Sequence, residues 1–145
     1  MKVIEMNNRE HMVAVVDPTV GEDSTLDLAQ EVANRGGRVT VMVLASRNTV
    51  AGMSAFADSE DLPLPDAREI YLERLAAQYT ERFGSHQAAA TILTGSDASR
   101  FVFATAARTA ATMIAMPQRL AARRGWRSSV AKSPVPVLIA PPRAA

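Results

Sequence analysis

The chain has 145 residues, of which 48% are hydrophobic, and a formal net charge of +1, values that suit one globular domain with a buried core. It contains no cysteine, which excludes disulfides and thiolate metal sites. No apolar run approaches the roughly 20 residues of a membrane-spanning helix, and the first residues lack the pattern of a signal peptide, so we expect a cytoplasmic protein.

Charge is distributed unevenly along the chain. All 15 acidic residues lie at or before Asp97, whereas residues 98–145 carry eight Arg or Lys and no acid. A basic end attracts phosphate groups or nucleic acid. The alternative is that the two charge sets face each other within the fold or across a dimer. Few aromatic side chains accompany the bases, so nucleic acid is not the expected partner.

The first predicted strand runs from His11 to Val16 and ends at Asp17. Its unbroken apolar character is typical of a strand buried on both faces, in the middle of a parallel sheet. Asp17 would then stand at the carboxyl edge of the sheet, where open α/β folds bind ligands. Because Pro18 follows, Asp17 is equally well interpreted as a turn residue that caps the next helix.

The next segments continue an alternation of helix and strand. Ser24 and Asp27 resemble a capping box, so a helix is expected from Ser24 to a stop at Gly36. Residues 38–44 predict a second strand. Residues 45–65 lack a consistent period and are interpreted as a long loop, and an amphipathic helix is expected from Asp66 to Gly84.

The second half predicts three more strands, at residues 87–93, 112–116 and 135–140, with an apolar helix over 98–109 and a basic segment over 119–132. Pro136 inside the last strand favours an edge position. Five strands alternating with helical segments predict an α/β fold with a doubly wound, Rossmann-like parallel sheet in one domain covering residues 1–145.

Motifs for other chemistry are missing from the sequence. His11 and His86 belong to no Ser-His-Asp arrangement and are interpreted as surface residues. Neither a dinucleotide-binding nor a P-loop glycine motif occurs. The seven methionines are interpreted as core residues. We therefore expect no catalytic residue, no metal site and no enzymatic activity.

Three stretches carry a resemblance to the universal stress protein family that covers nearly the whole chain: residues 13–19, 39–44 and 133–139. The last, Ser-Pro-Val-Pro-Val-Leu-Ile, is similar to the closing strand of that family and is the most specific of the three. The resemblance implies an adenine nucleotide alpha hydrolase-like fold with sheet order 3-2-1-4-5. It also implies a homodimer paired through the last strand, Val135 to Ala140, whose two apolar faces would need covering at a sheet edge.

The same resemblance implies where an adenine nucleotide would be held. The matching positions are Asp17, Leu44, Met116, Ser129 and Val130. The family's glycine loop is not matched, because Pro117 and Leu120 stand where its first two glycines belong. Proline fixes φ and removes one backbone donor, so the phosphate cradle is expected to be absent.

Four arginines in the basic segment offer side-chain contacts to phosphate in place of the cradle: Arg119, Arg123, Arg124 and Arg127. The other interpretation is that they are solvated surface residues. We expect a stress-response regulatory or interaction module that holds no cofactor. The alternative is a protein that binds ATP or another adenine nucleotide through Asp17 and residues 119–129, including a slow hydrolase.

Overall fold

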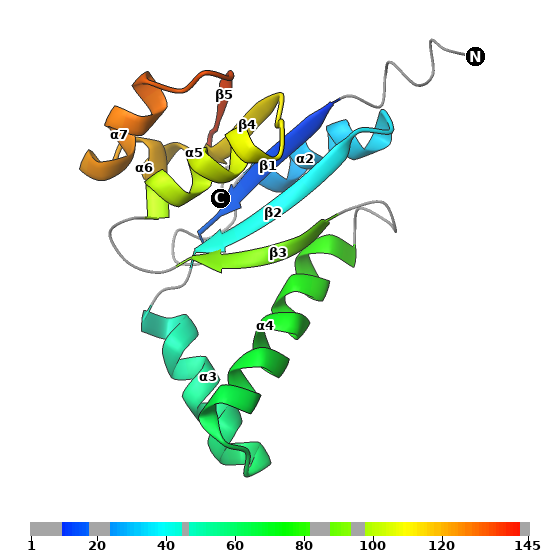
Figure 1. The fold of residues 1–145 in the computed structure, drawn as a ribbon, viewed down its shortest axis with the longest axis vertical. Helices are drawn as coiled ribbons and strands as arrows, with labels where there is room; N and C mark the ends of the chain where they lie inside the picture. Colours follow the sequence, from blue (N-terminus) through cyan, green and yellow to red (C-terminus); the bar gives the residue numbers. More distant parts are fainter. Residues whose placement is uncertain (1–9, 18–23, 45–46, 82–87, 94–97, 143–145) are drawn as a thin grey trace.

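The computed structural model describes residues 10–17, 24–44, 47–81, 88–93 and 98–142 and has an α/β architecture (Figure 1). The strands are β1 (His11–Val16), β2 (Arg38–Leu44), β3 (Ala88–Leu93), β4 (Met113–Pro117) and β5 (Val137–Ala140). The helices are α2 (Thr25–Asn34), α3 (Arg47–Glu60), α4 (Leu64–Thr80), α5 (Ala98–Arg108), α6 (Gln118–Ala121) and α7 (Arg124–Ala131). All paired strands are parallel, in the order β3-β2-β1-β4-β5, so the expectation of a parallel α/β sheet is confirmed.

Strand β1 lies at the centre of the sheet, between β2 and β4. Its residues Met12 to Val15 are at most 1% exposed. Successive side chains of a strand point to opposite faces, and here they enter two separate clusters. Val13 and Val15 join one cluster, and Met12 and Ala14 join the other. The sheet is therefore covered on both faces, as the unbroken apolar run predicted.

The two faces have different covers. The cluster that contains Val13 and Val15 is closed by α5, α6 and α7, and the opposite cluster is closed by α2 (Figure 1). Leu120 of α6 and Trp126 of α7 are the large side chains by which the last two helices enter the core, at 0% and 8% exposure. No helix within the described ranges is long and apolar enough to cross a membrane.

Helix α2 begins and ends close to the predicted positions. Ser24 occupies the N-cap, but its hydroxyl makes no capping hydrogen bond, so the capping box is not formed. Instead the hydroxyl and the backbone N–H of Ser24 both donate to the carbonyl oxygen of Pro141, at 3.0 and 3.3 Å. Gly36, with φ of 84°, takes the left-handed conformation that follows the helix. The start of α2 is thus tied to the end of β5 rather than capped by its own side chain.

The prediction of a loop over residues 45–65 is wrong, because α3 covers Arg47–Glu60 and α4 begins at Leu64. Pro63 is the N-cap of α4, with φ of −56° and ψ of 143°, and Pro65 lies in its first turn, where a missing N–H costs no helical hydrogen bond. Helix α3 packs on α4, and α4 packs along β3. The α3–α4 hairpin extends away from the sheet in Figure 1.

Strand β5 lies at one end of the strand order, which is the edge position expected from Pro136. The strand itself begins at Val137, two residues later than predicted. The carbonyl of Pro136 still accepts a hydrogen bond from the N–H of Ile114 at 3.0 Å, so this proline flanks the ladder without interrupting it.

Candidate functional site

Asp17 follows the last residue of β1 at the carboxyl edge of the sheet, and it is only 4% exposed. The chain passes from β1 to β2 on one side and later adds β4 on the other side. The carboxyl ends of β1 and β4 therefore flank the topological switch point, where open α/β sheets bind ligands. The N-cap of α2 is Ser24, so Asp17 does not cap that helix.

Arg123 reaches Asp17 from the far end of the sequence. One guanidinium nitrogen, Nη2, lies 3.3 Å from Oδ2 of Asp17. The Asp17 side chain is 4% exposed and the Arg123 side chain is 52% exposed, so the pair joins a buried anion to a cation that remains half in solvent. Burying a carboxylate without a compensating charge costs roughly several kcal/mol of folding free energy, and the Arg123 guanidinium offsets part of that cost.

Two backbone features hold Arg123 in position. Its residue lies between α6 and α7, and it is the N-cap of α7 with φ of −66° and ψ of 144°. Its carbonyl accepts hydrogen bonds from the N–H groups of Trp126 and Arg127, both at 2.9 Å. Because Leu120 and Trp126 are buried on either side, the backbone at Arg123 is fixed to the core, and only its side chain extends over the sheet edge.

The segment after β4 takes a helical form. Pro117 ends β4 and is also the N-cap of α6, with φ of −62° and ψ of 144°. Leu120, at 0% exposure, packs in the same core cluster as Met116. Of the two residues at the positions of the family's glycines, Pro117 thus ends β4 and Leu120 packs in the core.

The remaining predicted site residues are only partly brought together. Leu44 follows Val43, which is paired with Val16, so Leu44 ends β2 beside the end of β1. Met116 stands one residue before the end of β4. The side chains of Leu44 and Met116 are buried at 8% and 0% exposure and pack in the core, which leaves their backbone as the part at this edge.

Ser129 and Val130 lie on α7, in the half of the helix that is farther along the chain from Arg123. Ser129 is roughly 8 Å along the helix axis from Arg124, the first residue of α7. Both residues are half-buried, and Val130 packs against the core cluster. The structure gives these two residues a place in the layer that covers the sheet and assigns them no contact with Asp17.

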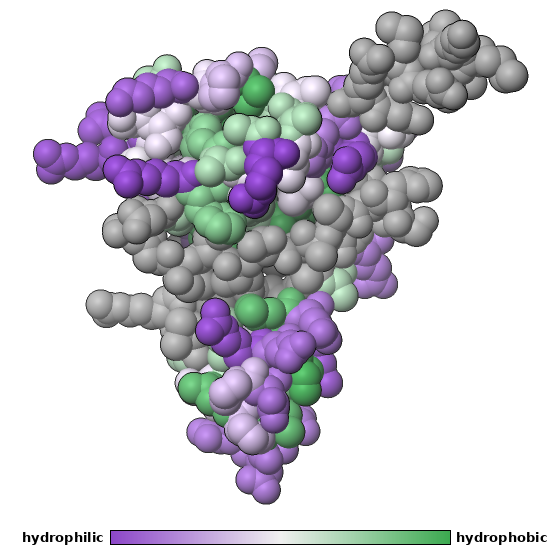
Figure 2. Space-filling model, in the orientation of Figure 1, coloured by the Kyte–Doolittle hydropathy of each residue, from purple (hydrophilic) through white to green (hydrophobic). Residues whose placement is uncertain are grey.

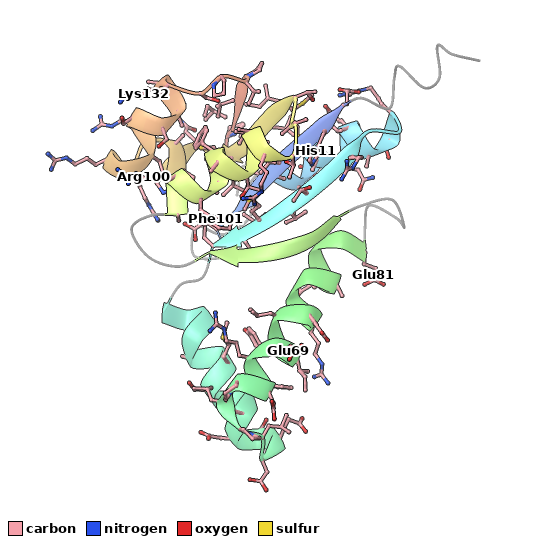
Figure 3. All side chains as sticks on the ribbon, viewed as in Figure 1. His11, Glu69, Glu81, Arg100, Phe101 and Lys132 are labelled. Atoms are coloured by element: carbon pink, nitrogen blue, oxygen red, sulfur yellow. The ribbon has the colours of Figure 1, made fainter. Side chains whose placement is uncertain are left out.

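The arginines of the basic segment are exposed, and the described part of residues 98–142 contains no acid. Figure 2 shows hydrophilic side chains over the end of the molecule that α6 and α7 form. Figure 3 shows Arg100 on α5 and Lys132 beyond α7 on this same side. Sequence reasoning assigned Arg123 to phosphate or to solvent and missed its pairing with Asp17. The available signal was the uneven charge distribution, which favoured contact between early acids and late bases.

His11 corrects a second expectation, because it is buried at 3% exposure and is not a surface residue. Its Nδ1 lies 3.2 Å from the carbonyl oxygen of Thr109, and its Nε2 lies 2.7 Å from Oγ1 of Thr40. Since a carbonyl can only accept, Nδ1 carries the proton and Nε2 accepts from the Thr40 hydroxyl. Burial lowers the pKa of His11 below its usual value, and the nearby Arg38 cation lowers it further, against the Thr109 carbonyl, which raises it.

His11 begins β1, at the opposite end from Asp17, and Figure 3 shows it on that strand. It therefore joins β1 to β2 and to the end of α5 and takes no part in the site at the carboxyl edge. His86 lies outside the described residues. Those residues hold no group of three or more His, Asp or Glu side chains arranged for a metal ion.

Comparisons with known proteins show the fold. No protein-family model matches the chain, and none of the curated proteins is significantly similar in sequence. Among solved structures, a universal stress protein from Archaeoglobus fulgidus is 16% identical with a TM-score of 0.55, over 90% of this chain and 93% of that one. A member of the universal stress protein family from Burkholderia pseudomallei is 19% identical with a TM-score of 0.52, over 90% and 95%.

A third structure, of a universal stress protein in complex with cAMP, is 15% identical with a TM-score of 0.50, over 90% of this chain and 94% of that one. At these identities the likeness establishes the fold alone. The chain has the fold of universal stress proteins, as the resemblance of its three sequence stretches implied.

Proposed function

We propose that this protein is a homodimeric regulatory or interaction module of the universal stress type, without catalytic activity and without a bound nucleotide. The observation that carries the proposal is the state of the sheet edge at the end of β1. Asp17 is already engaged by Arg123 at 3.3 Å, and β4 continues directly into α6. An adenine nucleotide entering this edge would have to displace the guanidinium and would meet no glycine-rich backbone cradle after β4.

The exposed apolar surface of β5 supports the dimer. Leu138 and Ile139 are 38% and 42% exposed and point to opposite faces of the strand, so both faces of this edge strand carry exposed apolar surface. An edge strand of this kind pairs readily with another chain. Two-fold pairing with a second copy covers the β5 edge of both copies at once.

Isothermal titration of the wild-type protein with ATP, ADP, AMP and cyclic AMP tests the absence of nucleotide binding. We expect no heat of binding at protein concentrations of tens of micromolar. Saturable binding of any of the four with a micromolar dissociation constant would contradict the proposal.

A second candidate is an adenine-nucleotide-binding protein, and one observation favours it: a structure of similar fold is a complex with cAMP. In this candidate Asp17 accepts hydrogen bonds from the ribose, and the arginines of residues 119–129 contact phosphate. If a nucleotide does bind, Asp17→Ala and Arg124→Ala should each weaken it. Unchanged affinity in both variants would exclude this assignment.

A further inference from the structure

We propose that α5 and α7 form a docking surface, and that its occupant is the tip of the α3–α4 hairpin of a second copy of this chain. The contact is head to tail, because two different surfaces meet in it. It is separate from the pairing of β5 edges proposed above and does not depend on it.

The occupant, which we call the acidic tip, is the turn that joins α3 to α4. It carries four exposed acidic side chains: Asp58, Glu60, Asp61 and Asp66. No Lys or Arg lies between residues 48 and 67, so the tip contains no base of its own. Among the acids stands Leu64, which is 54% exposed. Figure 1 shows the turn at the end of the hairpin farthest from the sheet, where another molecule can reach it.

The docking surface, which we call the basic face, consists of exposed side chains on α5 and α7, two helices that pack on each other. Its cations are Arg100, Arg124 and Arg127, and residues 98–142 contain no acid. Phe101, which Figure 3 shows with Arg100 on α5, is 45% exposed. Each surface therefore combines one sign of charge with one exposed large apolar side chain. Protein interfaces commonly have such an apolar centre and a polar rim.

Several of these charges oppose the dipoles of their own helices. Asp58 and Glu60 lie in the last turn of α3, where the free carbonyl groups are already partly negative. Arg100 lies in the first turn of α5, and Arg124 and Arg127 lie in the first turn of α7, where the free N–H groups are partly positive. These positions disfavour the charges within each helix. A partner of opposite charge would offset that cost.

The two surfaces do not meet within one copy. Helix α3 packs on α4, and α4 packs along β3, whereas α5 and α7 cover the central strands from the other end of the molecule (Figure 1). Within the described residues, the ion pairs of Glu10 with Arg35 and of Asp17 with Arg123 lie outside the hairpin. No carboxylate of the acidic tip has a basic partner there. The partner charges must therefore come from another molecule.

A second copy fits both surfaces at once, because every copy brings one acidic tip and one basic face. The formal net charge of +1 means that copies do not repel each other strongly as whole molecules. A nucleic acid would match the basic face alone and would leave the acidic tip without a partner. Charge complementarity thus favours a second copy as the occupant.

A head-to-tail contact that does not close into a ring gives open chains of molecules. The acidic tip is a small surface, so the association should be weak and should grow with protein concentration. It should also depend on salt, because the screening length falls from roughly 30 Å at about 0.01 M salt to about 3 Å at about 1 M. Apolar pairing of β5 edges should persist at high salt.

The test reverses charge on one surface at a time and follows self-association by sedimentation velocity at about 0.01 M and about 0.5 M NaCl. The tip variant is Asp58→Lys with Glu60→Lys, and the face variant is Arg124→Glu with Arg127→Glu. Like charges then oppose each other, so each variant should self-associate at least about tenfold more weakly than the wild type at low salt. An equimolar mixture of the two variants should recover the wild-type association constant to within about threefold, because each new surface matches the other variant.

The matched control is Glu73→Lys with Glu81→Lys. These exposed acids lie on the same hairpin, farther along α4 toward β3, and their reversal changes the net charge by the same amount as in the tip variant. We expect the control to associate as the wild type does. Misfolding is excluded by thermal melting, since the tip and face variants both place charges that suit the helix dipoles and should melt no lower than the wild type.

Three results would each overturn the inference: wild-type association that does not change with salt, a control that weakens as much as the tip variant, or a mixture that does not recover association. Preferential binding of the basic face to duplex DNA, with self-association unaffected by the tip variant, would assign that face to nucleic acid instead. Failure of the proposed function is read separately, from nucleotide titration and from the species that remains at about 0.5 M NaCl.

Discussion

Leu120→Ala tests the packing that fixes the α6–α7 junction, where Arg123 lies, to the core. Leu120 is 0% exposed and is the side chain by which the four-residue helix α6 enters the core. Leu to Ala changes at fully buried positions typically cost about 2–5 kcal/mol, from lost burial and from the cavity left behind. We take about 3 kcal/mol, since α6 is short and near the surface and can partly collapse into the gap. At about 3 °C per kcal/mol for a chain of this size, the melting temperature should fall by about 10 °C.

Urea unfolding, followed in parallel by circular dichroism and by tryptophan fluorescence, measures this loss. Trp126 is the single tryptophan of the chain and belongs to the same core cluster as Leu120, so its emission reports on the docking of α7. With a slope of about 2 kcal/mol per molar urea, the midpoint should fall by about 1.5 M. The matched control is Leu64→Ala, because Leu64 is 54% exposed at the start of α4 and its loss should cost less than about 0.5 kcal/mol.

The reasoning would be refuted if Leu120→Ala and Leu64→Ala lowered stability by similar amounts. A fluorescence transition well below the circular dichroism transition would mean that α7 leaves the sheet before the sheet unfolds. In that case the backbone at Arg123 is not fixed to the core as described above.

Three further perturbations follow from separate parts of the fold. The pKa of His11 is lowered in the folded state, so the stabilisation that neutral His11 provides is complete above pH 6.5, its ordinary pKa, and declines as the pH falls below that value. Between about pH 8 and pH 5, the melting temperature of the wild type should therefore fall more steeply than that of His11→Gln. Val137→Asp should convert a dimer into monomer or aggregate in sedimentation velocity, and a wild type that sediments as a monomer at micromolar concentration would contradict the proposed interface. Gly37→Ala should lower the free energy of unfolding by about 1–3 kcal/mol in chemical denaturation, because the added Cβ would lie 2.6 Å from Cγ1 of Val32, a residue that is 1% exposed. An unchanged free energy of unfolding would show that the start of β2 can shift to make room.

The strands were predictable because their signal is local. The residues of β1 are apolar without interruption, and β2 spans 38–44 as the β-rich run predicted. The sheet order could not follow from such runs alone and came from the resemblance in residues 133–139 and two other stretches. Proline before β5 was the one local feature that indicated an edge.

Helix α3 was missed because its composition hides its period. Val50, Met53 and Ala57 follow helical spacing, and Met53 and Ala57 are buried, but small residues and Gly52 lie between them. The prolines at 63 and 65 were interpreted as loop residues, whereas they begin α4. A proline that begins a helix cannot be told from a loop proline unless the helix after it is recognised from the sequence.

The contacts of Asp17 and His11 lay beyond any local pattern. Arg123 is 106 residues from Asp17, and Thr109 is 98 residues from His11. Only the folded order of the strands brings α5 and the α6–α7 junction to the two ends of β1. From the sequence alone, His11 was therefore interpreted as a surface residue, although both of its ring nitrogens have partners within the protein.

The α3–α4 hairpin between β2 and β3 is attached to the sheet mainly through α4, which packs along β3. Its buried residues Met53, Ala57 and Ala67 belong to neither of the two clusters that cover the sheet. Phe56 and Tyr71 make a tilted ring contact, with centroids 6.2 Å apart and planes inclined by 56°. The Arg74 guanidinium lies 5.1 Å from the centre of the Phe56 ring, so these contacts link α3 to α4 from within. Substitutions on α3 are thus expected to act mainly through packing within the hairpin, whereas substitutions on the side of α4 that faces β3 also act on the sheet.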